Sequence, residues 1–143
     1  MIILIEVNYI AVLAAAIASM GVGFLWYSPL LVGNQWLAEM GLSKKDMEKG
    51  KKNANKMYML STLGALVMAY VLYHVVEMSV AFYGYSRLQT GLTSAFWMWL
   101  GFVLPVQATD MLFGSKKIRL LAVNTGYQLA SLLAMGIVIG LMK

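Results

Sequence analysis

The stretch that decides the fold runs from Ile118 to Met142 and reads IRLLAVNTGYQLASLLAMGIVIGLM, with Arg119 as its one charged residue. About 20 apolar residues are enough for a helix to cross the hydrocarbon core of a bilayer. Similar apolar runs cover residues 9–27, 58–76 and 91–113. Because helices satisfy their own backbone groups in lipid, we expect every run to be helical. The sequence therefore predicts an all-α integral membrane bundle of four transmembrane helices, a single domain over residues 1–143 with a loop of residues 28–57.

The composition also favours lipid as the solvent. Hydrophobic residues make up 61% of the chain and charged residues 12%, against a charged share of about 25% in soluble domains. The chain has no cysteine and one histidine, His74. This argues against thiol chemistry and against a Cys/His metal cluster. We expect no metal site and no cofactor.

Positive residues gather in two of the connections between the apolar runs. Two membrane crossings separate these connections, so both lie on the same side of the membrane. The other side has only Arg87 and Lys143. Loops rich in Lys and Arg stay in the cytoplasm, which predicts a bacterial or archaeal plasma membrane with both termini outside. For a chain of charge +5 placed this way, anionic lipids are the expected partner and nucleic acid is not. The residues concerned are Lys44, Lys45, Lys49, Lys51, Lys52 and Lys56 in the first connection, and Lys116, Lys117 and Arg119 in the second.

The first connection begins with a helix signal. Ser28 is a suitable N-cap and Pro29 suits the first helical position. Trp36 and Leu37 then fall on one side and Asn34 on the other. The pattern predicts a short cytoplasmic helix in the membrane interface over residues 28–41.

Small residues recur at four-residue spacing, which is typical of close helix contacts in membranes. These rows favour packing inside the bundle; alternatively, one face of the last span serves a second copy of the chain. Since charge makes all copies insert the same way, such a homodimer or higher homo-oligomer would be parallel. The rows are Ala11, Ala15, Ser19 and Gly23, then Ser61, Ala65 and Ala69, then Ala122, Gly126, Ala130 and Ala134, and finally Gly136 and Gly140.

Asp110 is the clearest ionisable residue inside a span, and such residues are costly in lipid and often functional. Gln107 shares its helical face, and Asn124 and Gln128 pair at i, i+4 spacing with Tyr127 beside them. If these faces converge, together with Ser61 and Thr62 of the second span, they form a polar pocket open to the cytoplasm. The other interpretation is structural: Asp110 pairs with loop lysines, and the amides join helices by hydrogen bonds.

At the other membrane face, His74 and Glu77 lie one turn apart, with Glu6 and Arg87 on the same side. We expect these residues to meet water and headgroups and not a transition metal. His74 and Asp110 fall near opposite membrane faces, which excludes a Ser–His–Asp triad between them. The sequence predicts that the protein is not an enzyme.

Several segments resemble a bacterial membrane-protein family catalogued as domain of unknown function 1761. The resemblance implies a four-helix protein of this length and carries no activity. It makes the turn from Trp26 to Pro29, with Trp26 and Ser28 as its candidate site residues, and the segment from Asn124 to Gln128 the better candidates for a shared site. The segments are Asn8 to Leu13, Leu25-Trp26-Tyr27-Ser28-Pro29-Leu30 with Gly33 and Trp36, Gly101-Phe102 with Pro105, Asn124 to Leu129, and Met135-Gly136 with Gly140.

Two functions are compatible with these observations. The first is a small-solute or ion transporter or binding protein that uses the cytoplasm-facing polar pocket. The second is a non-catalytic membrane assembly or interaction protein that uses its small-residue faces and its lysine-rich loop.

Overall fold

The computed structural model describes residues 5–28, 30–31, 33–41, 45–46, 54–114 and 117–142. Pro29, Lys116, Lys143 and most lysines of the loop 28–57 lie outside this set. The described residues form helices and turns, without strands. Within the described residues, four helical segments are long and apolar enough to cross a membrane, which confirms the predicted all-α bundle and indicates a membrane protein. They are α1 (Tyr9–Trp26), α4 (Ala54–Tyr83), the segment Arg87–Gly114 and α7 (Ile118–Leu141).

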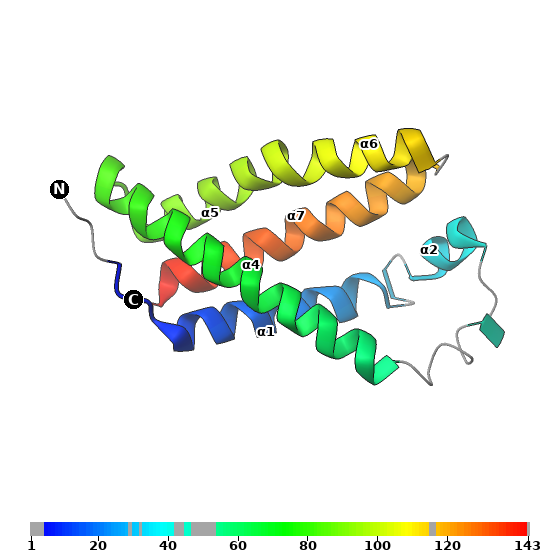
Figure 1. Cartoon of the computed structure of the whole chain (residues 1–143), viewed down its shortest axis with the longest axis horizontal. Coiled ribbons are helices and arrows are strands. Elements are labelled where there is room, and N and C mark those ends of the chain that lie inside the picture. Colours follow the sequence, from blue (N-terminus) through cyan, green and yellow to red (C-terminus); the bar gives the residue numbers. More distant parts are fainter. Residues whose placement is uncertain are drawn as a thin grey trace.

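The third segment is divided. It consists of α5 (Arg87–Met98), a π-helical turn η2 (Trp99–Val103) and α6 (Leu104–Gly114). Figure 1 shows them as one continuous rod along the upper edge of the molecule. Ser86 begins α5 as its N-cap and accepts a hydrogen bond from the Gln89 amide at 3.2 Å.

The second segment is longer than its apolar run predicts. Helix α4 has 30 residues, or about 45 Å at 1.5 Å per residue, whereas the apolar run covers only 58–76. Polar helix formers such as Lys56 and Glu77 extend the helix at both ends. It stops where Gly84 takes a left-handed conformation with φ of 72°.

Helix α7 lies between the other elements. It packs against α5 on one side and α1 on the other, and α4 crosses these helices diagonally (Figure 1). The buried residues concentrate at the end of the bundle where α1 begins and α7 ends. In contrast, η2 and α6 contain no buried residue. The core is made of Ala11, Val12, Ala15, Ala16, Ala65, Ala69, Leu72, Tyr73, Val76, Ala95, Leu132, Met135 and Ile139.

Helices α5 and α7 come into close backbone contact through glycines. A Cβ on Gly91 would overlap the carbonyl group of Gly136, and a Cβ on Gly136 would overlap the carbonyl group of Gly91. Gly140 lies against the backbone of Arg87 and Leu88 in the same way. Gly136 and Gly140 therefore serve packing within the chain, as the internal interpretation of the small-residue rows expects.

Arg87 joins three helices at this end. Its guanidinium donates Nη1 to the Glu77 carboxylate of α4, and Nη2 to the Ile139 carbonyl of α7 at 3.0 Å. The last carbonyls of a helix lack internal donors, and a cation there is favoured by the helix dipole. The side chains of Arg87 and Glu77 are 16% and 25% exposed. The sequence predicted contact with water and headgroups for these residues and missed their pairing, which forms because α7 ends where Arg87 can reach it.

We predict that Gly136→Ala lowers the free energy of unfolding by about 1–3 kcal/mol, because the added methyl group forces α5 and α7 apart. Gly64→Ala is the matched control, since nothing lies within 4 Å of a Cβ at Gly64. Equilibrium unfolding of both variants in detergent solution measures the difference in their free energies of unfolding. Equal stability of the two variants would contradict the close contact.

A double-mutant cycle tests the Arg87 arrangement. We expect Arg87→Met and Glu77→Gln to show a coupling energy of about 1–3 kcal/mol, because removing one partner leaves the other partly buried and unpaired. The Lys117–Glu39 pair, at 3.5 Å with Lys117 66% exposed, should couple by less than about 1 kcal/mol. Similar coupling in both cycles would show that Arg87 is only a surface charge.

Candidate functional site

The π-helical turn changes which side of the third segment faces α7. The buried face of α5 includes Gly91 and Ala95. Continued at 3.6 residues per turn, this face would pass through Phe102, Pro105, Thr109 and Leu112, and all of these are exposed. The residues that face the bundle after the turn lie one or two positions later; they are Val103, which packs on the core, and Gln107 and Met111, which line the pocket described below.

Pro105 accounts for the position of this turn. Its ring lacks an N–H and would clash with the carbonyl four residues earlier in a regular helix. The wider turn relieves the clash, and the Leu104 amide bonds the Trp99 carbonyl, five residues before it. Trp99 also donates its indole Nε1–H to the Thr125 carbonyl of α7 at 2.8 Å. The turn is thus attached to α7 at Thr125, next to the pocket residue Asn124.

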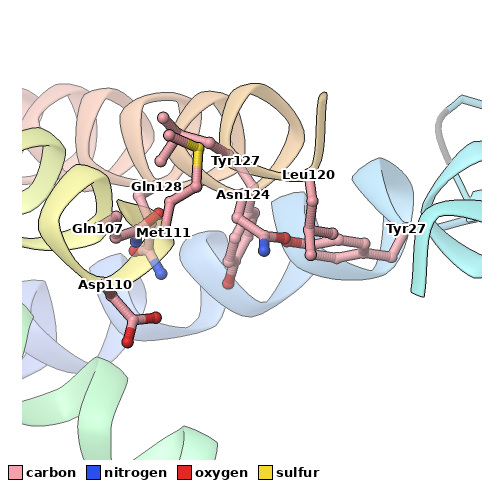
Figure 2. A pocket seen from close by; sticks show the side chains of 9 residues that line it. Tyr27, Gln107, Asp110, Met111, Leu120, Asn124, Tyr127 and Gln128 are labelled. Atoms are coloured by element: carbon pink, nitrogen blue, oxygen red, sulfur yellow. The ribbon is translucent and has the colours of Figure 1, made fainter. Parts of the chain in front are cut away.

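A pocket of about 320 Å³ lies between α6, α7 and the residue that follows α1. Figure 2 shows side chains from these elements extending into one space, with the Asp110 carboxylate, the Gln128 amide and the Tyr127 hydroxyl on the same side of α6 and α7. The residues predicted from the third and fourth spans are brought together here. Asp110, Gln107, Asn124, Tyr127 and Gln128 line the pocket, with Tyr27, Met111, Leu120 and Leu121.

Tyr27, which lies in the Trp26 to Pro29 turn of the family resemblance, is a further residue of the pocket lining. It follows the last residue of α1, and its hydroxyl donates to Asn124 Oδ1 at 2.7 Å. Its ring contacts those of Tyr127 and Trp36 edge-on, with centroids 5.1 and 5.5 Å apart. Burial, and secondarily Tyr127, raise the pKa of Tyr27 from 10.0 to about 12, so the phenol stays protonated and able to donate. The sequence feature that could have indicated its role is a tyrosine at the end of a predicted span.

Trp26 and Ser28 lie outside the lining. Trp26 donates Nε1–H to the Val123 carbonyl at 3.0 Å, and its ring covers Gly126. It holds α1 against α7 next to the pocket. Ser28 donates its hydroxyl to the Leu25 carbonyl at 2.6 Å, and among the described residues its side chain caps no helix.

The interfacial helix therefore begins later than predicted. Helix α2 covers Gly33–Met40, and the Gly33 amide donates to the Ser28 carbonyl at 2.9 Å. A Cβ on Gly33 would overlap the Tyr27 and Ser28 backbone, so only glycine allows the chain to turn this tightly before the helix. Glu39 of α2 pairs with Lys117 at 3.5 Å, which places α2 beside the start of α7.

Ser61 and Thr62 do not join the polar cluster, and this prediction was wrong. Both are exposed on α4, and Thr62 donates its hydroxyl to the Tyr58 carbonyl of its own helix at 2.7 Å. Thr62 borders a separate, apolar groove between α1 and α4. Because α4 crosses the bundle diagonally, its first half lies away from α6 (Figure 1).

The lining can bind a solute through hydrogen bonds and one carboxylate. Gln107, Asn124 and Gln128 supply amides, and Asp110 is the carboxylate among the described residues of the pocket. His74 lies elsewhere, with its Nδ1 2.8 Å from the Tyr70 carbonyl of α4. Among the described residues, no group of three His, Cys, Asp or Glu side chains could hold a metal ion.

Comparison with known proteins identifies a family. A model of the family described as "Protein of unknown function (DUF1761)" matches residues 10–140 and so includes every residue of the pocket. This confirms the family resemblance. Neither the curated proteins nor the solved structures yielded a match.

We predict that Tyr27→Phe lowers the free energy of unfolding by about 1 kcal/mol, because Asn124 loses a hydrogen-bond donor in a partly buried position. The control is Tyr9→Phe, since Tyr9 is 70% exposed and should change stability by less than about 0.5 kcal/mol. Unfolding of both variants in detergent measures the effect. A Tyr27→Phe protein as stable as the Tyr9→Phe protein would argue against the bond.

Proposed function

The chain belongs to this family of proteins of unknown function, and we propose that it is a small-solute or ion transporter or binding protein that works through the pocket between α6 and α7. The observation that carries the proposal is the convergence of polar residues from two spans on one space. Gln107 and Asp110 come from α6, and Asn124 and Gln128 come from α7. Polar groups at such positions raise the free energy of a membrane protein unless they are paired or contact water.

The size of the pocket supports a solute over simple hydrogen bonding between helices. Its 320 Å³ would hold on the order of ten water molecules at about 30 Å³ each. Amides that only joined helices would be expected to close such a space by bonding each other. Here Asn124 bonds a residue of another element, Tyr27, and this bond supports the pocket wall.

We propose that the pocket lies toward the cytoplasm. Lys117 and Arg119 stand at the start of α7, at the pocket end of the bundle, and positive residues favour the cytoplasmic side. With four spans, both termini are then outside, in the plasma membrane of a bacterium or archaeon. Anionic lipids are the proposed partners of the lysine-rich loop. We assign no catalytic role to any residue, and nucleic acid is not a proposed partner.

The alternative function is membrane assembly. It is favoured by the exposure of the third segment, Arg87–Gly114. No residue of its most apolar stretch is buried within the chain, whereas 28% or more of the residues are buried in the corresponding stretch of each other span. A parallel homodimer or higher homo-oligomer could cover this face.

Accessibility of the pocket tests the proposal, and the absence of native cysteine makes the test clean. We expect Asn124→Cys and Gln128→Cys to react with a membrane-impermeant maleimide added from the cytoplasmic side and not from the outside. Gln128→Cys keeps the bond between Tyr27 and Asn124.

Three controls set the scale. Ser131→Cys, on the same helix but 1% exposed, should stay unreactive. Gln35→Cys of α2 and Tyr85→Cys, between α4 and α5, are exposed and report the two membrane sides. If both pocket cysteines are as unreactive as Ser131→Cys in a folded protein, transport and solute binding are wrong, and assembly becomes the better explanation.

A further inference from the structure

A second hollow lies outside the polar pocket, in the groove between α1 and α4. Its volume is about 440 Å³ and its lining is mostly apolar. Leu13, Ile17 and Phe24 line it from α1, and Tyr58 and Leu66 line it from α4. Helices α1 and α4 cross and then diverge toward the end of α1 (Figure 1), so the groove lies where they separate. Because Ile17 is 63% exposed, the groove is open on the side that would face lipid.

The groove has the depth of one lipid leaflet. Leu13 and Phe24, its two ends on α1, lie about 17 Å apart along the helix at 1.5 Å per residue. One leaflet supplies about 15 Å, half of a hydrocarbon core of about 30 Å. Beyond Leu13, the helices are packed together through buried small residues such as Ala11 and Ala69. A groove that ends at mid-membrane suits an acyl chain better than a helix of a second copy, which would continue across the bilayer.

Gly21 gives the groove its depth. It lines the groove, and a Cβ at this position would have no atom within 4 Å. The missing side chain is therefore space that a CH₂ chain can occupy. A larger side chain at Gly21 would fill the groove without pushing α1 and α4 apart, which makes this residue suitable for a test.

The open end of the groove has a positive charge at the level of the headgroups. Lys56 is exposed in the first turn of α4, and Asn55 lies on the same helical face as the groove residue Tyr58. The rings of Phe24 and Tyr58 are 5.6 Å apart, at a depth where aromatic residues mark the interface. Helix α1 has no acidic residue, and the first turn of α4 has none. Lysine at such a helix end reaches the interface and attracts anionic headgroups.

We infer that this groove is the binding site of an anionic phospholipid. One acyl chain lies in the groove between α1 and α4, and the headgroup lies at the first turn of α4, near Asn55 and Lys56. The site is separate from the polar pocket. It rests on the proposed function only in taking anionic lipids as partners at this end of the molecule.

Native mass spectrometry of the whole chain in detergent tests the inference. The protein is titrated with dioleoyl phosphatidylglycerol or dioleoyl phosphatidylcholine, which have the same acyl chains and differ in headgroup charge. We expect the first phosphatidylglycerol to bind about fivefold or more tightly than the first phosphatidylcholine. Gly21→Leu should weaken both lipids by about fivefold or more, because it removes the space for the chain. Gly64→Leu is the matched control, since Gly64 has equally open surroundings but does not line the groove.

Two further variants separate the headgroup from the chain. Lys56→Glu should weaken phosphatidylglycerol by about fivefold or more and leave phosphatidylcholine unchanged. Arg119→Glu is its control, because Arg119 is exposed at the start of α7, at the opposite edge of the bundle from the start of α4 (Figure 1). Thr62→Leu fills the groove from the α4 side and should act in the same direction as Gly21→Leu, so the result does not depend on one variant.

The outcomes distinguish the groove from a general attraction to the lysine-rich loop. If Gly21→Leu and Thr62→Leu bind phosphatidylglycerol as Gly64→Leu does, the groove is not the site, and the proposed lipid contact of the loop stands. The inference is also wrong if Lys56→Glu acts no differently from Arg119→Glu, or if Gly21→Leu breaks a dimer, which would assign the groove to a second copy. Equal affinities for both lipids in the unaltered protein would overturn the inference and the proposed lipid contact together. The solute pocket is tested separately, by the maleimide labelling.

Discussion

The backbone contact between Gly91 and Gly136 sets the spacing of α5 and α7, and the rest of the bundle is arranged around it. Lipid offers no hydrophobic drive between helices, so close packing must supply the attraction. Small residues of α1 and α4, such as Ala15 and Ala69, are fully buried at the same end. Arg87 adds hydrogen bonds to α4 and to the end of α7. Tight packing is therefore concentrated in one half of the molecule.

The other half is free to hold polar chemistry because it carries less of the packing. There α6 contains no buried residue, and α4 crosses away from it (Figure 1). Trp26 and Tyr27 keep α1 attached to α7 at this end through hydrogen bonds to Val123 and Asn124. These bonds hold the pocket wall without filling the pocket. The molecule thus separates a dry, small-residue core from a polar site along the length of the same helices.

Much of this arrangement could be predicted from residue spacing. The apolar runs predicted the spans, and the i, i+3 and i, i+4 spacings placed Gln107 with Asp110 and Asn124 with Gln128 on common faces, because these distances lie within one helix. What spacing could not give was the relation between helices. Ser61 and Thr62 have a suitable depth, yet the crossing of α4 takes them away from the pocket. Ser28 has the chemistry of an N-cap, but the contact of Gly33 with the preceding backbone moved the helix start. The role of Arg87 depends on where α7 ends in space.

The π-helical turn Trp99–Val103 has a consequence for how the family should be compared. Such a turn accommodates an additional residue within an otherwise α-helical segment, so the third span has two separate phases, one before residue 99 and one after residue 103. A helical wheel drawn through the whole span assigns Phe102 and Thr109 to the inside, although both are exposed. A relative with one residue fewer in this turn would keep nearly the same hydropathy profile and present different side chains to α7. Alignments of these proteins should therefore be anchored independently on the glycine contact of α5 and on Pro105, with any gap placed between them.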